Sequence, residues 1–108
     1  MNLGVDLVTI SRFKNKNKEF IERLLSEEEL VKFNKLDSEE SKELFLARSW
    51  AIKEAIFKAD NSYFKFNKIN LIKINNEWNF KNFKISISHE NDLLIAFVIK
   101  EKKWRNWQ

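Results

Sequence analysis

Two carboxylates and a lysine stand out in this sequence because their neighbours are apolar. Asp6 interrupts the apolar stretch Leu3–Ile10, and Glu54 and Lys58 lie one helical turn apart in a long segment without helix breakers. Carboxylate oxygens suit a hard cation such as Mg²⁺, which takes one or two carboxylates together with phosphate oxygens and water. A lysine beside them would offset the charge of a phosphate group. These residue types are typical of phosphate chemistry, but spacing alone does not bring Asp6 next to Glu54.

Each of these residues also has an ordinary interpretation. Glu54 and Lys58 have the spacing of a surface i,i+4 ion pair, and strand alternation places Asp6 either beside Val8 or in water. On a helical wheel, however, Glu54 and Lys58 lie between two apolar faces. The first face consists of Leu44, Phe45, Ala51, Ile52, Ala55 and Ile56. The second consists of Leu46, Trp50 and Phe57. Because burying a lone carboxylate is costly, we expect the charged pair at a packed boundary or cleft.

The first half of the chain predicts the elements that would position these residues. Leu3–Ile10 is rich in Val and Leu and predicts a strand. Helical spacing and capping signals then predict three helices. They are about Lys18–Leu25, a short helix from the Ser26–Glu29 capping box through Phe33, and the main helix from about Glu39 to Ala59, which Ser38 begins.

After Asn61 the pattern alternates, which predicts strands. The strands are expected at Phe66–Ile74, Glu77–Phe80, Phe83–His89 and Leu93–Lys100, with Glu90–Asp92 as the clearest turn. We expect Asn61, Asn75 and Asn76 to replace turn glycines, because Asn tolerates the left-handed backbone conformation. The predicted fold class is α+β, with an N-terminal strand, a helical half containing one long helix, and a small antiparallel sheet.

The composition limits the class of protein. A chain of 108 residues fits a single domain over 1–108, with a basic aromatic tail at about 100–108. The chain has no cysteine, which excludes disulfides and thiolate or zinc–cysteine chemistry, and it shows no signal peptide or membrane-spanning run, so we expect a cytoplasmic protein. The net charge of +4 favours an acidic partner, whether nucleic acid, a membrane surface or an acidic protein.

A set of segments resembles one enzyme family. The segments are GVDL at Gly4–Leu7, ISRF at Ile10–Phe13, FIERLLS at Phe20–Ser26, FLARSWAIKEAIFKA at Phe45–Ala59 and ISISH at Ile85–His89. In this order they are similar to holo-[acyl-carrier-protein] synthases, small members of the 4'-phosphopantetheinyl transferase superfamily, and the similarity runs from about Leu3 to Ile99. It implies transfer of the 4'-phosphopantetheine arm of coenzyme A to a serine of apo acyl carrier protein, for fatty-acid synthesis, with release of adenosine 3',5'-bisphosphate.

The resemblance also implies roles for particular residues. Asp6 and Glu54 would bind Mg²⁺, and Lys58 would face the phosphates of coenzyme A. His89 would contribute to the nucleotide phosphate contacts, and Arg12 would help to dock the acidic carrier protein. The resemblance further implies a homotrimer with active sites between subunits, and the second apolar face of the main helix would accept such an arrangement.

Three departures from the family pattern bear on these roles. Ser49 stands where the family has an arginine, and Arg48, one position earlier, is the candidate to replace it in nucleotide binding. A shift of one residue on a helix rotates the side chain by about 100°, so Arg48 should not simply make the same phosphate contact. The glycine-rich turn after the helix reads Ala59-Asp60-Asn61-Ser62, and the region Lys14–Lys18 looks shortened. Lys53 is expected to be solvated or in contact with nucleotide.

Two alternative functions stay open at this stage. The basic charge and the aromatic residues of the tail would suit a small module that binds single-stranded nucleic acid, although most aromatics occupy core positions and acidic residues are dispersed throughout the chain. A protein of the same fold could also bind coenzyme A or a carrier protein with weakened catalysis, because of the changes at Ser49 and Asn61. The resemblance favours the enzyme and predicts neither a nucleic-acid nor a membrane partner.

Overall fold

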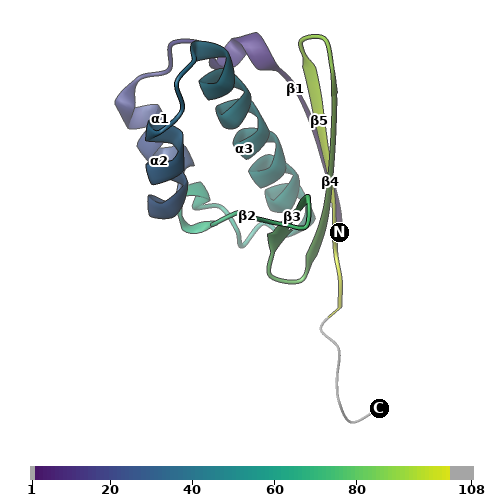
Figure 1. Ribbon diagram of the computed structural model, residues 1–108. Coiled ribbons are helices and arrows are strands. Elements are labelled where there is room, and N and C mark those ends of the chain that lie inside the picture. Colours follow the sequence, from purple (N-terminus) through teal and green to yellow (C-terminus); the bar gives the residue numbers. More distant parts are fainter. Residues whose placement is uncertain (1, 103–108) are drawn as a thin grey trace.

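The computed structural model describes residues 2–102 and consists of a helical layer against one antiparallel sheet (Figure 1). The sheet order is β1-β5-β4-β3-β2. The strands are β1 (Leu3–Thr9), β2 (Ile72–Ile74), β3 (Glu77–Phe80), β4 (Phe83–Glu90) and β5 (Leu93–Lys100). The N-terminal strand therefore pairs with the last strand of the chain, and Asp6 lies opposite Ala96 in that pairing. The predicted α+β class is confirmed.

The helices begin where the apolar spacing, for the first helix, and the capping signals, for the other two, predict. α1 (Lys18–Leu24) is capped by Asn17, and α2 (Glu27–Asn34) starts with the complete Ser26–Glu29 capping box. α3 (Glu39–Ala59) has the predicted bounds, because the Ser38 side chain accepts a hydrogen bond from the backbone of the first turn. Short 3₁₀ helices, η1 (Ile10–Phe13) and η2 (Phe66–Lys68), connect these elements.

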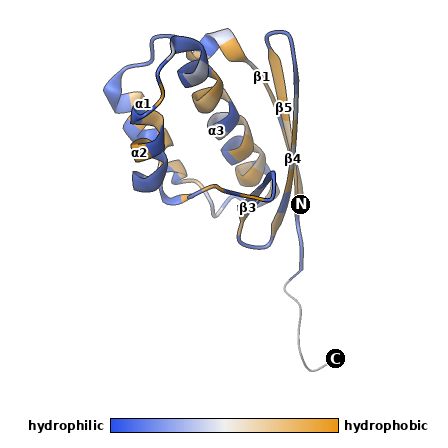
Figure 2. Ribbon diagram, viewed as in Figure 1, coloured by the Kyte–Doolittle hydropathy of each residue, from blue (hydrophilic) through white to orange (hydrophobic). Residues whose placement is uncertain are grey.

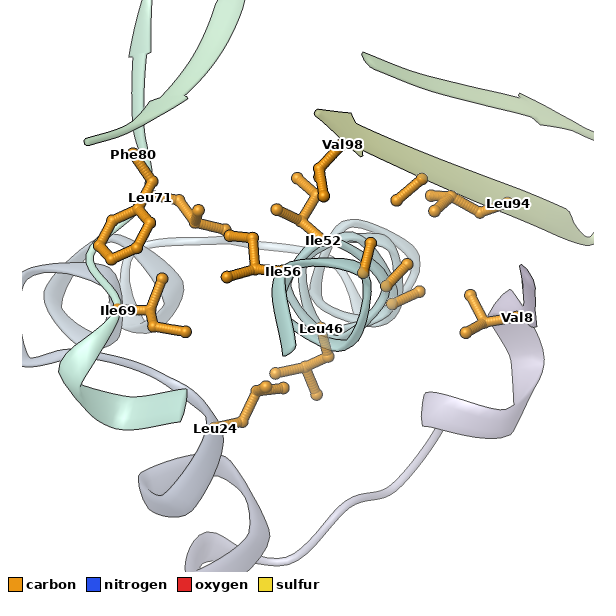
Figure 3. Packing of buried hydrophobic residues seen from close by; sticks show 14 of the residues in the cluster. Val8, Leu24, Leu46, Ile52, Ile56, Ile69, Leu71, Phe80, Leu94 and Val98 are labelled. Atoms are coloured by element: carbon orange, nitrogen blue, oxygen red, sulfur yellow. The ribbon is translucent and has the colours of Figure 1, made fainter. Parts of the chain in front are cut away.

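The hydrophobic core surrounds α3. Strand alternation turns Val8 of β1 and Leu94, Ala96 and Val98 of β5 toward the helix, where all four are buried. Figure 2 shows hydrophobic segments on α3 and on the sheet that it covers. In Figure 3, Ile52 of α3 lies between the β5 side chains and the Leu24 side of the helical layer. Burial of these side chains on both sides of α3 fixes the helix against the sheet.

The single glycine of the chain sets the distance between α3 and β1. A Cβ atom on Gly4 would lie 1.7 Å from the carbonyl oxygen of Ala55, far inside van der Waals contact. The absence of a side chain therefore lets the helix backbone approach the strand closely. This contact places the turn of α3 around Ala55 directly over β1, two residues before Asp6.

The predicted strand Phe66–Ile74 is wrong over most of its length. Its first residues form η2, and only Ile72–Ile74 pair with β3. The physical reason is that side chains satisfy the backbone groups before β2. The carbonyl of Phe66 accepts a hydrogen bond from Lys53, and the N–H of Leu71 donates one to Glu29. These groups do not need a neighbouring strand.

The residues with a left-handed backbone conformation are only partly those predicted from the sequence. Asn75 and Asn76 have positive φ angles of 51° and 64°, as expected for the β2–β3 turn. Asn61 does not; its side chain instead donates a hydrogen bond to the carbonyl of Phe57 in the last turn of α3. Asn15, Lys81 and Asn91 also have positive φ angles.

None of the helices in the described part of the chain is both long and apolar enough to cross a membrane. Most of the basic aromatic tail lies outside the described residues.

Candidate functional site

Asp6 and Lys58 meet across the interface between β1 and α3. Lys58 Nζ donates to Asp6 Oδ1 at 3.1 Å and to the carbonyl oxygen of Val5 at 2.9 Å. The Asp6 side chain is only 15% exposed, whereas that of Lys58 is 49% exposed. Asp6 therefore faces the helix together with Val8, rather than water, and Lys58 joins it to solvent.

Glu54 lies one turn before Lys58 and shares this environment. Burial raises the pKa of the Glu54 carboxyl, and the negative charge of Asp6 raises it further, while Lys58 and Arg12 lower it. Four charged side chains thus influence one another where α3, β1 and η1 meet. No salt bridge forms between Glu54 and Lys58 here, so the interpretation as a simple surface pair does not describe this site.

The donor set fits a divalent cation that prefers oxygen. Asp6 Oδ2 is buried and is the one buried side-chain polar atom among residues 2–102 without a hydrogen-bond partner. A buried carboxylate oxygen without a partner is costly, and a nearby second carboxylate adds repulsion, so a cation between them would relieve both. Within the described range no cluster of three or more metal-binding side chains occurs. Two carboxylates with phosphate and water as the other ligands are enough for Mg²⁺.

A pocket of about 690 Å³ lies beside Glu54. Its floor belongs to α3 and its two walls to α1 and to the segment around η2. The lining residues are Phe20, Arg23, Leu24, Trp50, Glu54, Phe57, Phe64, Lys65, Phe66 and Asn67. This pocket was not predicted from the sequence. The second apolar face of the main helix, with Trp50 and Phe57, is the signal that could have indicated it.

Arg12 lies at the same edge of the molecule. Its guanidinium carbon is 5.8 Å from the ring centroid of Trp50, a pocket residue, and its charge lowers the pKa of Glu54. The side chain is exposed. The structure therefore brings the predicted docking arginine next to the carboxylates.

Two other predicted site residues lie elsewhere in the single chain. His89 is exposed on β4 opposite Leu94 of β5, so β5 separates it from β1. Arg48 stacks on Trp78 with a guanidinium–centroid distance of 4.7 Å and borders a separate cavity of about 200 Å³. Burial lowers the pKa of Arg48. One chain therefore joins Asp6, Glu54, Lys58 and Arg12, but not these two residues.

The expectation that Lys53 is solvated or touches nucleotide is wrong. The Lys53 side chain is fully buried and forms an ion pair with Glu29 at 2.6 Å. Its position on the helix turns it away from Asp6 and into the contact between α3, α1 and η2.

The fold and the site define a class of transferase. A model of the 4'-phosphopantetheinyl transferase superfamily matches residues 2–107, and the chain belongs to this superfamily.

Relatives and solved structures make the assignment more specific. The holo-[acyl-carrier-protein] synthase of Mycoplasma mobile is 57% identical over 94% of this chain and 90% of its own length. That of Mycoplasmopsis pulmonis is 48% identical over 91% of this chain and 88% of its own. The Helicobacter pylori enzyme, solved in complex with coenzyme A, is 26% identical with a TM-score of 0.70, covering 92% of this chain and 99% of that one. A Bacillus anthracis enzyme shares the fold with a TM-score of 0.83 at 24% identity, over 94% of this chain and 96% of that one. The predicted family is confirmed.

Proposed function

We propose that this chain is a holo-[acyl-carrier-protein] synthase that transfers the 4'-phosphopantetheine group of coenzyme A to a serine of apo acyl carrier protein. The products are holo acyl carrier protein, for fatty-acid synthesis in the cytoplasm, and adenosine 3',5'-bisphosphate. The observation that carries the proposal is the convergence of Asp6, Glu54 and Lys58 at the contact between β1 and α3. Relatives named for this activity match nearly the whole chain.

The reaction is a phosphoryl transfer. The serine hydroxyl gives up its proton to a base, for which Glu54 and water are the candidates. Its oxygen forms a bond to phosphorus, the pyrophosphate P–O bond breaks, and the leaving nucleotide takes the negative charge. Such reactions need alignment and charge stabilisation rather than covalent catalysis. Lys58 is suited to this task because its ammonium group is held by Asp6 and Val5 yet is half exposed.

Asp6 and Glu54 are the proposed Mg²⁺ ligands. Mg²⁺ bound there would neutralise charge on the phosphate oxygens of coenzyme A. The support from this structure is the unpartnered Oδ2 of Asp6 and the raised pKa of Glu54. Asp6 also holds Lys58 in place, because Asp6 Oδ1 accepts a hydrogen bond from the Lys58 ammonium group.

The pocket beside Glu54 is the proposed docking site for the carrier protein. Its aromatic floor and walls would receive an apolar side chain of the partner, and the cations Arg12, Arg23 and Lys65 at its edge would face acidic groups. The net charge of +4 agrees with an acidic partner. A carrier protein docked here would present its serine next to the carboxylates.

We further propose that the enzyme is a homotrimer. The outer face of the sheet exposes Leu3, Val5, Leu7, Leu93, Ile95, Phe97 and Ile99. A contiguous apolar face of this kind is typical of an interface. His89 lies outside the charged cluster of its own chain. A neighbouring subunit would therefore supply nucleotide contacts, including those proposed for His89 and Arg48.

The decisive experiment measures the mass of intact apo acyl carrier protein after incubation with the enzyme, coenzyme A and Mg²⁺. We expect one phosphopantetheine to be added, and addition to stop when the metal is chelated. Asp6→Ala and Glu54→Ala should abolish transfer while circular dichroism shows a folded protein. Asp37→Ala removes an exposed carboxylate before α3 and is the matched control, which should retain activity.

A different result would favour the binding-only alternative. If the wild-type protein binds coenzyme A or the carrier protein but leaves the carrier unmodified, the proposed transfer is wrong. Oligonucleotide binding that weakens steeply with salt, together with no binding of coenzyme A, would instead support the nucleic-acid alternative.

A further inference from the structure

Lys53 and Glu29 form a buried ion pair that the reaction described above does not use. Lys53 Nζ donates to Glu29 Oε1 at 2.6 Å, to the carbonyl of Leu24 at 2.7 Å and to the carbonyl of Phe66 at 2.9 Å. These bonds use all three ammonium protons. The side chains are 0% and 4% exposed, so both charges are removed from water.

Both carboxylate oxygens of Glu29 are also hydrogen-bonded. Its Oε1 also accepts the N–H of Ser26 at 2.9 Å, and its Oε2 accepts the N–H of Leu71 at 2.7 Å. The pair therefore links the end of α1, the start of α2, the middle of α3 and both ends of the segment from η2 to β2. A buried pair whose ammonium group and both carboxylate oxygens are hydrogen-bonded is rigid, and loss of one partner leaves a buried charge.

The backbone groups that Lys53 holds belong to the two walls of the pocket beside Glu54. Leu24 lies on the α1 wall and Phe66 on the η2 wall, and both line the pocket. Trp50, one turn before Glu54 on the floor, stacks on Phe20 of one wall at 5.8 Å and meets Phe66 of the other edge-on at 5.7 Å. The Lys53 side chain extends from the same helix, and its ammonium group bonds to a backbone carbonyl in each wall. This one ammonium group therefore joins the backbone of the α1 wall to that of the η2 wall.

The charged cluster has separate supports. α3 is held on β1 by the close contact at Gly4, and Lys58 is bonded directly to Asp6 and Val5. None of these contacts passes through Lys53 or Glu29. A change in the buried pair should therefore move the pocket walls without moving Asp6, Glu54 or Lys58.

We propose that Lys53 and Glu29 are positioning residues that hold the docking pocket open at the width its partner requires. This inference rests on the proposed function, because it assigns the pocket to the carrier protein. The proposal gives the pair a role in binding the carrier protein, but none in binding coenzyme A or in the chemical step.

The kinetic test uses the double variant Lys53→Met/Glu29→Leu, which replaces the ion pair with apolar side chains of similar size and leaves no buried charge. We expect KM for apo carrier protein to rise about tenfold, while kcat and KM for coenzyme A change less than about twofold. Glu29→Gln is a second variant, which keeps the side-chain shape but removes the negative charge beside Lys53. Its amide NH₂ must face either the N–H of Leu71 or the Lys53 ammonium group, both of which are donors. Glu29→Gln should also raise KM for apo carrier protein. The control is Ile52→Val, a fully buried neighbour outside the network.

A second measurement does not depend on activity. Trp50 is the only tryptophan left after Trp78→Phe, Trp104→Phe and Trp107→Phe, and it lies between the two pocket walls. In this background the double variant should make Trp50 fluorescence severalfold more sensitive to quenching by acrylamide, whereas Ile52→Val should not.

Three results would overturn the proposed positioning role of Lys53 and Glu29. It is overturned if KM for the carrier protein is unchanged, if all kinetic constants fall together, or if Ile52→Val at a matched loss of melting temperature has the same effects. If the wild-type protein shows no transfer, the proposed function fails, and Trp50 quenching alone decides whether the pair positions the pocket walls. Unchanged quenching in the double variant and in Glu29→Gln would then reject it.

Discussion

Glu54 lies where burial and a neighbouring negative charge both oppose ionisation. The pKa of its carboxyl is raised above the ordinary value of 4.5, first by desolvation and then by Asp6. Nearby Asp6 has an oxygen that finds no partner among the described residues. Groups arranged for binding a cation in this way are unfavourable for the folded chain when the cation is absent.

A stability measurement on Glu54→Gln tests this view of the site. A carboxyl with a raised pKa in the folded state contributes stability that is complete below the unfolded pKa and is lost as pH rises through the folded pKa. The ionised carboxylate is therefore destabilising at neutral pH. With metal chelated, we expect Glu54→Gln to raise the melting temperature by a few degrees at pH 7, and to have little effect well below pH 4.5.

The control for that experiment is Asp37→Asn, which neutralises an exposed carboxylate outside the site. It should leave the melting temperature unchanged at both pH values. A Glu54→Gln protein that is less stable than the wild type at pH 7 would contradict the electrostatic description, because it would mean that the ionised carboxylate is stabilised in the metal-free fold.

At the scale of elements, the site depends on how closely α3 approaches β1. Asp6 comes from the strand, whereas Glu54 and Lys58 come from the helix, so the separation of the two elements sets the distances among these groups. The contact of Gly4 with the Ala55 carbonyl fixes that separation. Because the obstructing atom belongs to the helix backbone, it cannot rotate away as a side chain could.

Gly4→Ala is therefore expected to impair both folding and activity. The added methyl group would push α3 from β1, lowering the free energy of unfolding by about 1–3 kcal/mol or more. It would also lengthen the bond between Lys58 and Asp6, so kcat should fall. Thermal unfolding and steady-state transfer assays measure the two effects.

Val8→Ala in the same strand is the comparison for Gly4→Ala. It removes buried methyl groups without adding an atom at the close contact, so it should lower the melting temperature but largely retain kcat. Equal loss of kcat in the two variants at equal stability would show that the spacing at Gly4 has no special role.

At the scale of the whole molecule, the sheet has one face against α3 and one face open. Val5 and Phe97 are direct cross-strand partners on the open face and are 48% and 41% exposed. Their neighbours on β1 and β5 are also apolar. An isolated chain would expose this apolar face to water and would tend to aggregate. This favours the proposed association of subunits, which would bury the face.

Phe97→Lys should disrupt this association. A charge at the centre of the open face would have to be buried in the interface, whereas it can be solvated in the monomer. Sedimentation equilibrium should show a trimer for the wild type and a folded monomer for Phe97→Lys, with much weaker coenzyme A binding because the neighbouring subunit's contacts are missing. Val31→Lys, at another exposed apolar residue, on α2, should remain trimeric. A wild-type monomer with full activity would reject the proposal.

Much of the fold could be predicted because its signals are local. Ser38 and Ser26 mark the starts of α3 and α2 through hydrogen bonds within the first turn, and alternation indicates β4 and β5 within a residue of their ends. The segment Phe66–Ile74 could not be predicted in the same way. Its hydrogen-bond partners, Lys53 and Glu29, are distant in the sequence, and its apolar pattern alone predicts a strand.

The sequence by itself determined the chemistry that is available: an aspartate in the first strand, a glutamate and a lysine one turn apart, and a set of motifs that indicates the family. Only the tertiary structure decided which of these groups meet. It brought Lys58 and Glu54 to Asp6, gathered Arg12 beside them, and buried Lys53 beneath a pocket that no spacing revealed. The reason is that side-chain types and helical or strand periods are properties of short segments, whereas contacts between β1, α3 and η2 arise only when the core packs.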